Sequence, residues 1–258
     1  MSVTIVDHLF ALLLAVPLPI LGVWQYRRLR SRLDAGEADA RVRHYRSLIV
    51  EELLVAGAAI ALWLASGRPW DALAPGTPEA WTWAGWAGWA AAAAVSALLV
   101  VQTAALRRDE DLLDARRQLA PVAAFLPRTA REHRIFQALA VTAGVAEEVV
   151  FRGFAMAWCA ALASGPLDLG PGAALGFAVL ASSALFGLAH AYQGPSGMAR
   201  TAAVGVVLAG LATATGGLLA PMAVHAVLDV TSGLVARRAF LAEPLDGVPG
   251  PEAAGGTR

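Results

Sequence analysis

The residues from Thr82 to Leu106 form a run of 25 amino acids without a charged side chain. At about 1.5 Å per residue of α-helix, this run is long enough to cross a hydrocarbon core of roughly 30 Å. Leu9–Tyr26 is a second uncharged run. It is preceded by Asp7 and His8 rather than by the basic residues of a secretory signal. We therefore expect a membrane protein that retains its first helix.

The composition supports this class. The chain has 258 residues, of which 57% are hydrophobic and only 16% charged, which is too apolar for an ordinary soluble domain. Its formal net charge is zero, so nothing indicates a nucleic-acid partner. Cys159 is the only cysteine, which excludes a disulfide within the chain and any metal centre built from several cysteines.

The apolar runs predict an all-α, polytopic membrane bundle, because they lack the alternating pattern of barrel strands. About seven transmembrane helices are expected, at 8–26, 47–66, 82–106, 135–163, 173–192, 196–215 and 218–237. No internal repeat is evident, so we expect a single transmembrane domain over residues 1–242. Residues 243–258 are rich in proline and glycine and are expected to form a disordered cytoplasmic tail.

The arginines predict how the bundle lies in the membrane. Segments 27–46 and 107–134 carry seven arginines each, whereas Arg68 is the only arginine in an expected external segment. Short cytoplasmic loops collect positive charge, so we expect the amino terminus outside and the carboxyl terminus in the cytoplasm of a cell (inner or plasma) membrane. Segment 107–134 is also a candidate for an amphipathic surface segment. Tryptophans cluster near the outer end of the third helix, as in an interfacial belt: Trp70, Trp81, Trp83, Trp86 and Trp89.

Six polar residues interrupt the apolar helices of the second half: Glu147, Glu148, Arg152, His190, His225 and Asp229. Glu148 and Arg152 are four residues apart and can pair along one helix face. His225 and Asp229 have the same spacing and project to one side. Glu147 is turned by about 100° from Glu148, so it is free to point elsewhere.

These residue types suggest hydrolytic chemistry. Arg152 can neutralise Glu148, which leaves Glu147 to accept a proton from water or to bind a cation. Glu147, His190, His225 and Asp229 are also a plausible ligand set for a divalent metal such as zinc. A purely structural role is the alternative for any one of them, but six polar residues on three membrane helices favour function.

A second pair of glutamates, Glu51 and Glu52, has a different context. The pair falls near the arginine-rich end of the expected second helix, and no arginine follows four residues later. We interpret it as interfacial.

Three short patterns resemble one known family. "EEVVFR" contains Glu147, Glu148 and Arg152, "FGLAH" contains Phe186 and His190, and "HAVLD" contains His225 and Asp229. In this order they are similar to the EExxxR, FxxxH and HxxxN/D motifs of the CPBP intramembrane proteases, which include CAAX prenyl endopeptidases and bacteriocin-immunity proteins. The resemblance covers residues 125–234, the expected catalytic core, and makes residues 1–107 accessory helices.

The resemblance implies a metallo- or glutamate-dependent intramembrane endopeptidase that acts on a membrane-associated peptide or protein. Glu147 would activate water, with His190 holding that water or a metal. His225 and Asp229 would stabilise the oxyanion or bind the metal, and Glu148, Arg152 and Phe186 would support them. Many members have asparagine at the last position; an ionised Asp229 only accepts hydrogen bonds, which favours a metal-binding or orienting role there. We expect a cavity open toward the cytoplasm, with Glu147 close to His190.

Other functions fit parts of the sequence. "GPSG", with Ser196, followed by His225 resembles the GxSG…H arrangement of rhomboid serine proteases, although it leaves Glu147 and His190 unexplained. No HExxH motif of a zinc protease occurs. A proton- or ion-relay carrier and a non-catalytic scaffold or immunity protein remain alternatives. The sequence indicates neither the particular substrate nor the oligomeric state.

Overall fold

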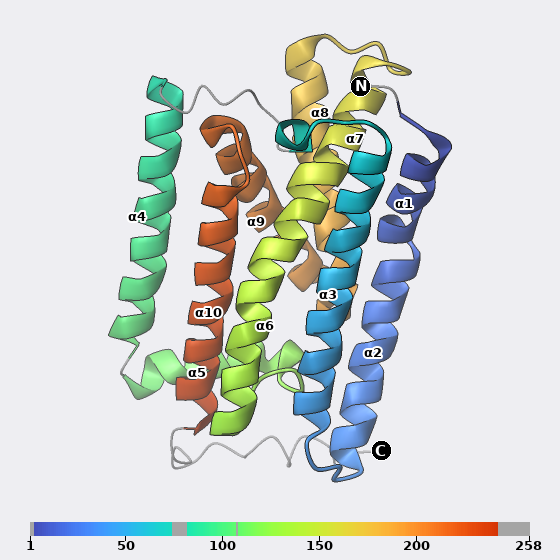
Figure 1. Cartoon of the computed structure of the whole chain (residues 1–258). Helices are drawn as coiled ribbons and strands as arrows, with labels where there is room; N and C mark the ends of the chain where they lie inside the picture. Colours follow the sequence, from blue (N-terminus) through green and yellow to red (C-terminus); the bar gives the residue numbers. More distant parts are fainter. Residues whose placement is uncertain (1–2, 74–81, 107, 242–258) are drawn as a thin grey trace.

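The structure is a computed structural model that describes residues 3–73, 82–106 and 108–241. Within these ranges the chain forms helices and no strands (Figure 1). Trp81 and the predicted tail lie outside the described residues. The helices are α1 Ile5–Ala15, α2 Pro17–Asp34, α3 Ala40–Ala65, η1 Trp70–Leu73, α4 Trp83–Ala105, α5 Asp109–Leu119, η2 Ala120–Val122, α6 Ala130–Glu148, η3 Val149–Ala155, α7 Met156–Ser164, α8 Pro171–Ala189, η4 Ala191–Gln193, α9 Gly194–Thr215 and α10 Leu219–Leu241.

Six helical segments are long and apolar enough to cross a membrane, and α1 and α2 together make the first of them. A seventh rod consists of α6, η3 and α7, which follow one another without a break over residues 130–164. It runs the height of the bundle between α3 and α10 (Figure 1). This rod is not among the six apolar segments because charged residues lie at its start and in its middle. The prediction of an all-α membrane bundle with about seven crossing helices is confirmed.

The first two crossing segments extend further than predicted. The first covers Ile5–Asp34 and the second begins at Ala40, so only residues 35–39 connect them. Arginine is a good helix former, and the arginine-rich stretch therefore continues both helices beyond their apolar parts. The first segment is interrupted at Val16, where Pro17 and Pro19 remove backbone donors.

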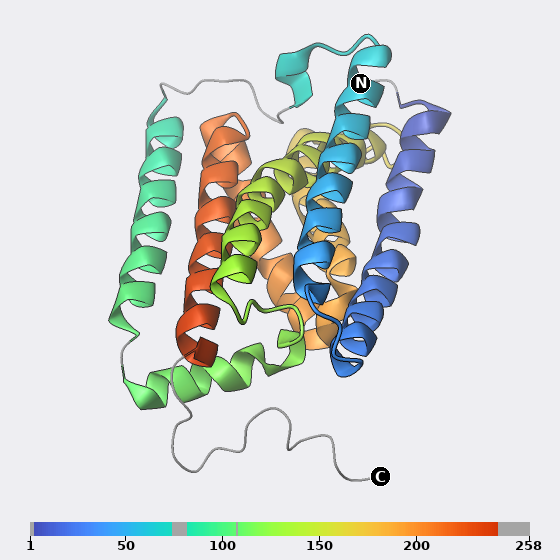
Figure 2. The ribbon, with the colours of Figure 1, turned by 60° about the horizontal axis from the view of Figure 1, so that its bottom comes forward.

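The arginine-rich segments gather at one end of the bundle. The α2–α3 connection, α5 and the end of α10 all lie at the lower end in Figure 1, whereas α1 begins at the upper end. In Figure 2, α5 lies across the lower end of the bundle rather than along it. This placement fits the predicted surface segment. The start of α1 and the end of α10 lie at opposite ends of the bundle, as an odd number of crossings requires.

Small residues let the helices that carry the polar motifs approach one another closely. A Cβ at Gly144 of α6 would lie 2.6 Å from the backbone nitrogen of Ala226 in α10. Another at Gly187 of α8 would lie 2.8 Å from Cβ of Ala202 in α9. Close packing of small residues is the usual way for membrane helices to associate. Here it brings α6 against α10 at the level of the EExxxR and HxxxD motifs.

Candidate active site

Glu148 and Arg152 form the buried ion pair that their spacing predicts. Nη1 of Arg152 donates to Oε1 of Glu148 at 2.9 Å, and the two side chains are 1% and 0% exposed. Nη2 of Arg152 donates to the carbonyl of Gly205 in α9 at 3.4 Å, and its guanidinium lies 4.2 Å from the ring centroid of Phe186 in α8. The arginine therefore neutralises Glu148 and links three elements.

The helix changes its hydrogen-bonding pattern directly after the two glutamates. Residues Val149–Ala155 form a π-helix, all of it buried, and Arg152 lies in its middle. The sequence predicts a helix over 135–163, and this helix is present with a π-helical middle. Single π-helical turns are frequent at functional sites, and the wider turn displaces the side chains that follow.

His225 of α10 joins this pair from the opposite side. Its Nδ1 lies 2.7 Å from Oε1 of Glu148. A carboxylate only accepts hydrogen bonds, so Nδ1 is the donor and the other ring nitrogen, Nε2, faces away from Glu148. Nε2 lies 3.6 Å from Oε2 of Glu147 and 3.7 Å from Oδ2 of Asp229, distances too long for direct hydrogen bonds.

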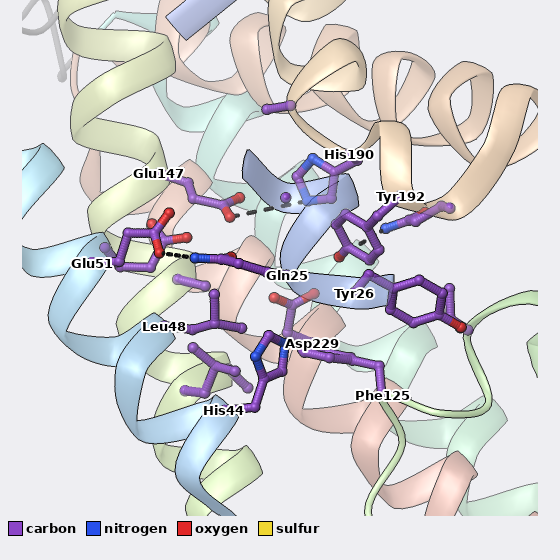
Figure 3. Close-up of a pocket in the computed structure, with 18 of the residues that line it drawn as sticks. Gln25, Tyr26, His44, Leu48, Glu51, Phe125, Glu147, His190, Tyr192 and Asp229 are labelled. Carbon is purple, nitrogen blue, oxygen red and sulfur yellow. Dashed lines mark hydrogen bonds and ion pairs between the residues drawn. The ribbon is translucent and has the colours of Figure 1, made fainter. Parts of the chain in front are cut away.

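Glu147 points away from the Arg152 pair and toward α8. Its Oε1 lies 4.0 Å from Nε2 of His190, as Figure 3 shows. Its Oε2 is buried and has no hydrogen-bond partner among the described residues. As predicted, Glu148 forms the ion pair with Arg152, whereas Glu147 does not share it and lies close to His190.

The orientation of His190 follows from its own hydrogen bond. Its Nδ1 lies 2.8 Å from the carbonyl oxygen of Phe186, which can only accept. Nδ1 therefore carries the proton, and Nε2 presents a lone pair toward Glu147. Phe186 also packs edge-on against the rings of His190 and His225, at centroid distances of 4.8 and 5.6 Å, and so fixes both histidines.

Glu147, His190 and Asp229 line one cavity of about 360 Å³. The cavity extends from Glu147 toward the arginine-rich end, where Tyr26 and Phe125 contribute to its wall. The Asp229 side chain is 35% exposed and faces this space. A peptide and water can both reach these groups only through such a cavity, because the surrounding bilayer holds almost no water.

The interpretation of Glu51 and Glu52 as interfacial was wrong. Both line the cavity, and the carboxyl groups of Glu52 and Glu147 lie within hydrogen-bonding reach of each other. Nε2 of Gln25 in α2 donates to Oε2 of Glu51 at 2.7 Å. The sequence could not show this, because it depends on the packing of α3 against α6, which turns the two glutamates toward the cavity. Two adjacent acids inside an apolar helix were the available signal.

The four predicted metal ligands do not form a preformed metal site. Among the described residues, no group of three or more histidine, cysteine, aspartate or glutamate side chains is arranged to hold a metal ion. One ring nitrogen of each histidine is already engaged, by Glu148 or by the carbonyl of Phe186. A hydrogen bond from the second ring nitrogen is the usual arrangement in a metal-binding histidine and leaves each Nε2 free, so metal binding at these residues stays a prediction.

Ser196, the alternative nucleophile, is exposed at the start of α9 and is absent from the described cavity wall. His225 is instead engaged with Glu148. The rhomboid-like arrangement therefore has no support in the geometry.

Glu147, His190 and Asp229 thus share one cavity of a helical bundle, and His225 lies beside Glu147 and Asp229. Residues 132–231 match the model of the Rce1-like family, described as type II CAAX prenyl endopeptidase Rce1-like. This match confirms the resemblance to the CPBP intramembrane proteases and includes all three motifs. No curated protein and no solved structure was found to match the chain.

Proposed function

We propose that the protein is an intramembrane endopeptidase that hydrolyses a peptide bond of a membrane-associated substrate by means of water activated by Glu147 and His190. The observation that supports this most directly is the separation of 4.0 Å between Oε1 of Glu147 and Nε2 of His190 on the wall of one cavity. Two hydrogen bonds of about 2.8 Å meeting at one water oxygen can span this gap.

Both groups accept hydrogen bonds from that water. Glu147 offers a carboxylate oxygen, and His190 offers the Nε2 lone pair because its Nδ1 proton is held by the carbonyl of Phe186. The water then donates one hydrogen to each, and its own lone pair is free to point at a substrate carbonyl carbon. General-base catalysis of this kind typically contributes about 10²–10⁴-fold to the rate.

The reaction follows in two steps. The water oxygen forms a bond to the carbonyl carbon while Glu147 takes a proton from the water, which produces a tetrahedral oxyanion. The carbon–nitrogen bond then breaks, and the proton held by Glu147 passes to the departing amine. The products are a carboxylic acid and an amine.

The oxyanion requires a donor, and His225 is placed to supply it. Because Nδ1 of His225 donates to Glu148, a second proton on Nε2 makes the ring an imidazolium whose Nε2 donates on the side of Glu147 and Asp229. Asp229, at 3.7 Å from Nε2, accepts hydrogen bonds and supports that positive charge. The Glu148–Arg152 pair fixes His225 from behind.

The topology belongs to the same proposal. With the amino terminus outside and the arginine-rich end in the cytoplasm of a cell membrane, the cavity opens to the cytoplasm. Peptide substrates would then reach Glu147 from the cytoplasmic side or from the adjoining membrane leaflet.

The test uses the purified protein in detergent with a mixture of short apolar peptides, in water enriched in ¹⁸O. New termini and label in the new carboxyl groups are read by mass spectrometry. We expect cleavage by the wild type and by Ser196→Ala, and loss of at least a hundredfold in Glu147→Gln and His190→Ala. Cleavage that does not depend on Glu147 contradicts the mechanism. If no sample, including the wild type, cleaves any peptide, the result favours a scaffold, immunity or ion-relay role.

A further inference from the structure

The cavity wall has a second half that the catalytic motifs do not supply. Residues of α2 and α3 line it opposite the motif helices, and both helices lie outside the matched segment 132–231. Hydrolysis as proposed needs only residues of α6, α8 and α10. The groups on α2 and α3 are therefore free to serve the recognition of the substrate.

The most distinctive polar contact on this wall joins Gln25 of α2 to Glu51 of α3. Nε2 of Gln25 donates to Oε2 of Glu51 at 2.7 Å, and both side chains line the cavity. In Figure 3 the pair is drawn between Glu147 on one side and Asp229 on the other. Gln25 and Glu51 therefore line the same cavity as Glu147 and Asp229, which a bound substrate would occupy.

The charge of Glu51 is oriented but not neutralised. Gln25 is a neutral partner, and among the described residues no arginine forms an ion pair with Glu51. An acidic side chain inside a membrane bundle is costly, so the presence of Glu51 on the cavity wall indicates a function. The partner that completes such a site is a cation, because a partly buried carboxylate is stabilised by an opposite charge.

The other acidic groups that line the cavity carry the same negative charge when ionised. Apart from Glu51, the ionisable lining groups of the cavity are the carboxyl side chains of Glu52, Glu147 and Asp229, two histidines and two tyrosines, and none of the described lining residues is an arginine. Oε2 of Glu147 is buried in the same place without a hydrogen-bond partner. A cationic side chain is therefore favoured in this space, and a carboxylate is disfavoured.

We propose that Gln25 and Glu51 form a specificity subsite in which the Glu51 carboxylate, held by Gln25, binds the ammonium or guanidinium of a lysine or arginine near the scissile bond. The inference rests on the proposed peptidase function and names its substrate class: apolar, membrane-associated peptides with one basic residue. A charge-assisted hydrogen bond of this kind corresponds to roughly a 10- to 100-fold preference.

The experiment compares short apolar peptides that differ at one position, which is lysine, the neutral isostere norleucine, or glutamate. Cleavage by the wild type is measured as kcat/KM. Binding of the same fluorescent peptides is measured to the inactive Glu147→Gln protein, so that recognition is tested apart from hydrolysis. Glu51→Gln is the informative variant, because glutamine keeps the shape of the side chain and a hydrogen bond to Gln25. Glu110→Gln, an exposed acid on α5, is the matched control.

We expect lysine peptides to be bound and cleaved at least tenfold better than norleucine peptides, and glutamate peptides to be the poorest. Glu51→Gln should abolish the preference, so that lysine and norleucine peptides are bound and cleaved equally well; Glu110→Gln should leave the preference intact. The preference should persist when ionic strength is raised, because a cavity is screened less than the surface.

Two other outcomes have separate meanings. Equal binding of the three peptides, or a preference that survives Glu51→Gln, overturns the subsite even if Glu147-dependent cleavage is present. A Glu51-dependent binding preference without any cleavage supports the subsite and counts against the proposed peptidase function.

Discussion

Nδ1 of His225 lies 2.7 Å from Oε1 of Glu148, the same oxygen that accepts from Nη1 of Arg152 at 2.9 Å. One carboxylate oxygen thus joins α6, the π-helix and α10 inside the bundle. All three side chains are at most 4% exposed, so water cannot replace any of these hydrogen bonds. The position of His225 beside Glu147 and Asp229 depends on this oxygen.

The first prediction concerns this network. Glu148→Gln leaves Arg152 buried without an ionised partner, and breaking a buried pair from one side costs about 3–5 kcal/mol. We expect a comparable fall in the free energy of unfolding and loss of peptide cleavage. The thiol of Cys159 is buried and is the only one in the chain, so its rate of dye labelling during unfolding reports stability directly.

The double variant Glu148→Gln with Arg152→Gln is the control for charge. It removes both charges together, so it should recover part of the stability lost in the single variant while remaining inactive. Equal stability of the wild type and Glu148→Gln would show that the pair contributes little.

The second prediction concerns the contact between α6 and α10. A methyl group at Gly144 would lie 2.6 Å from a backbone nitrogen of Ala226, which cannot move aside as a side chain can. Gly144→Ala should therefore destabilise the bundle by roughly 1–3 kcal/mol and reduce cleavage by separating Glu147 from His225. Gly57→Ala in α3 meets nothing within 4 Å and should be neutral or slightly stabilising. Identical labelling rates for the two variants would contradict the predicted close packing.

A third prediction separates stability from catalysis. Asp7 is fully buried near the end of the bundle remote from the arginine-rich segments, where it accepts from Arg68 at 2.5 and 2.8 Å and caps α1 together with Thr4. Asp7→Asn should lower the free energy of unfolding by about 2 kcal/mol or more, since it weakens both the ion pair and the cap. The kcat of the folded protein should stay unchanged. Asp114→Asn, which alters an exposed pair with Arg117, should change neither quantity.

A fourth prediction concerns the departure from asparagine in the last motif. In Asp229→Asn the amide can donate to the oxyanion directly, which compensates for the lost charge beside His225. We expect activity within about tenfold of the wild type, whereas Asp229→Ala, with neither function, should lose about 10²–10³-fold. Full activity in Asp229→Ala would remove this residue from the mechanism.

The fifth prediction concerns the metal. The mechanism proposed above uses water activated by Glu147 and His190 without a metal, so it predicts no stoichiometric zinc in the purified protein by elemental analysis. Glu147→Ala and His190→Ala, measured in the same preparation, control for adventitious metal. Near-stoichiometric zinc in the wild type that is lost in both variants would replace water activation by Glu147 with a metal-dependent reaction.

Local spacing determined much of this protein. Uncharged runs long enough for a bilayer predicted the helices, and the separation of four residues between Glu148 and Arg152 predicted their ion pair, because both follow from the period of a single helix. The offset between Glu147 and Glu148 likewise predicted that only one of them would be paired. The matched segment 132–231 confirms the resemblance drawn from these motifs.

Only the tertiary structure decided which residues of the other helices face Glu147. The contribution of α3 depends on its packing against α6, so Glu51 and Glu52 were misplaced although they were visible as a pair. The π-helical turn and the hydrogen bond from His225 to Glu148 also depend on close packing between helices, at Gly144 and Ala226. The period of a helix determines in which direction each side chain points around that helix's own axis. The distance between two helix axes depends instead on the side chains of both helices at their contact.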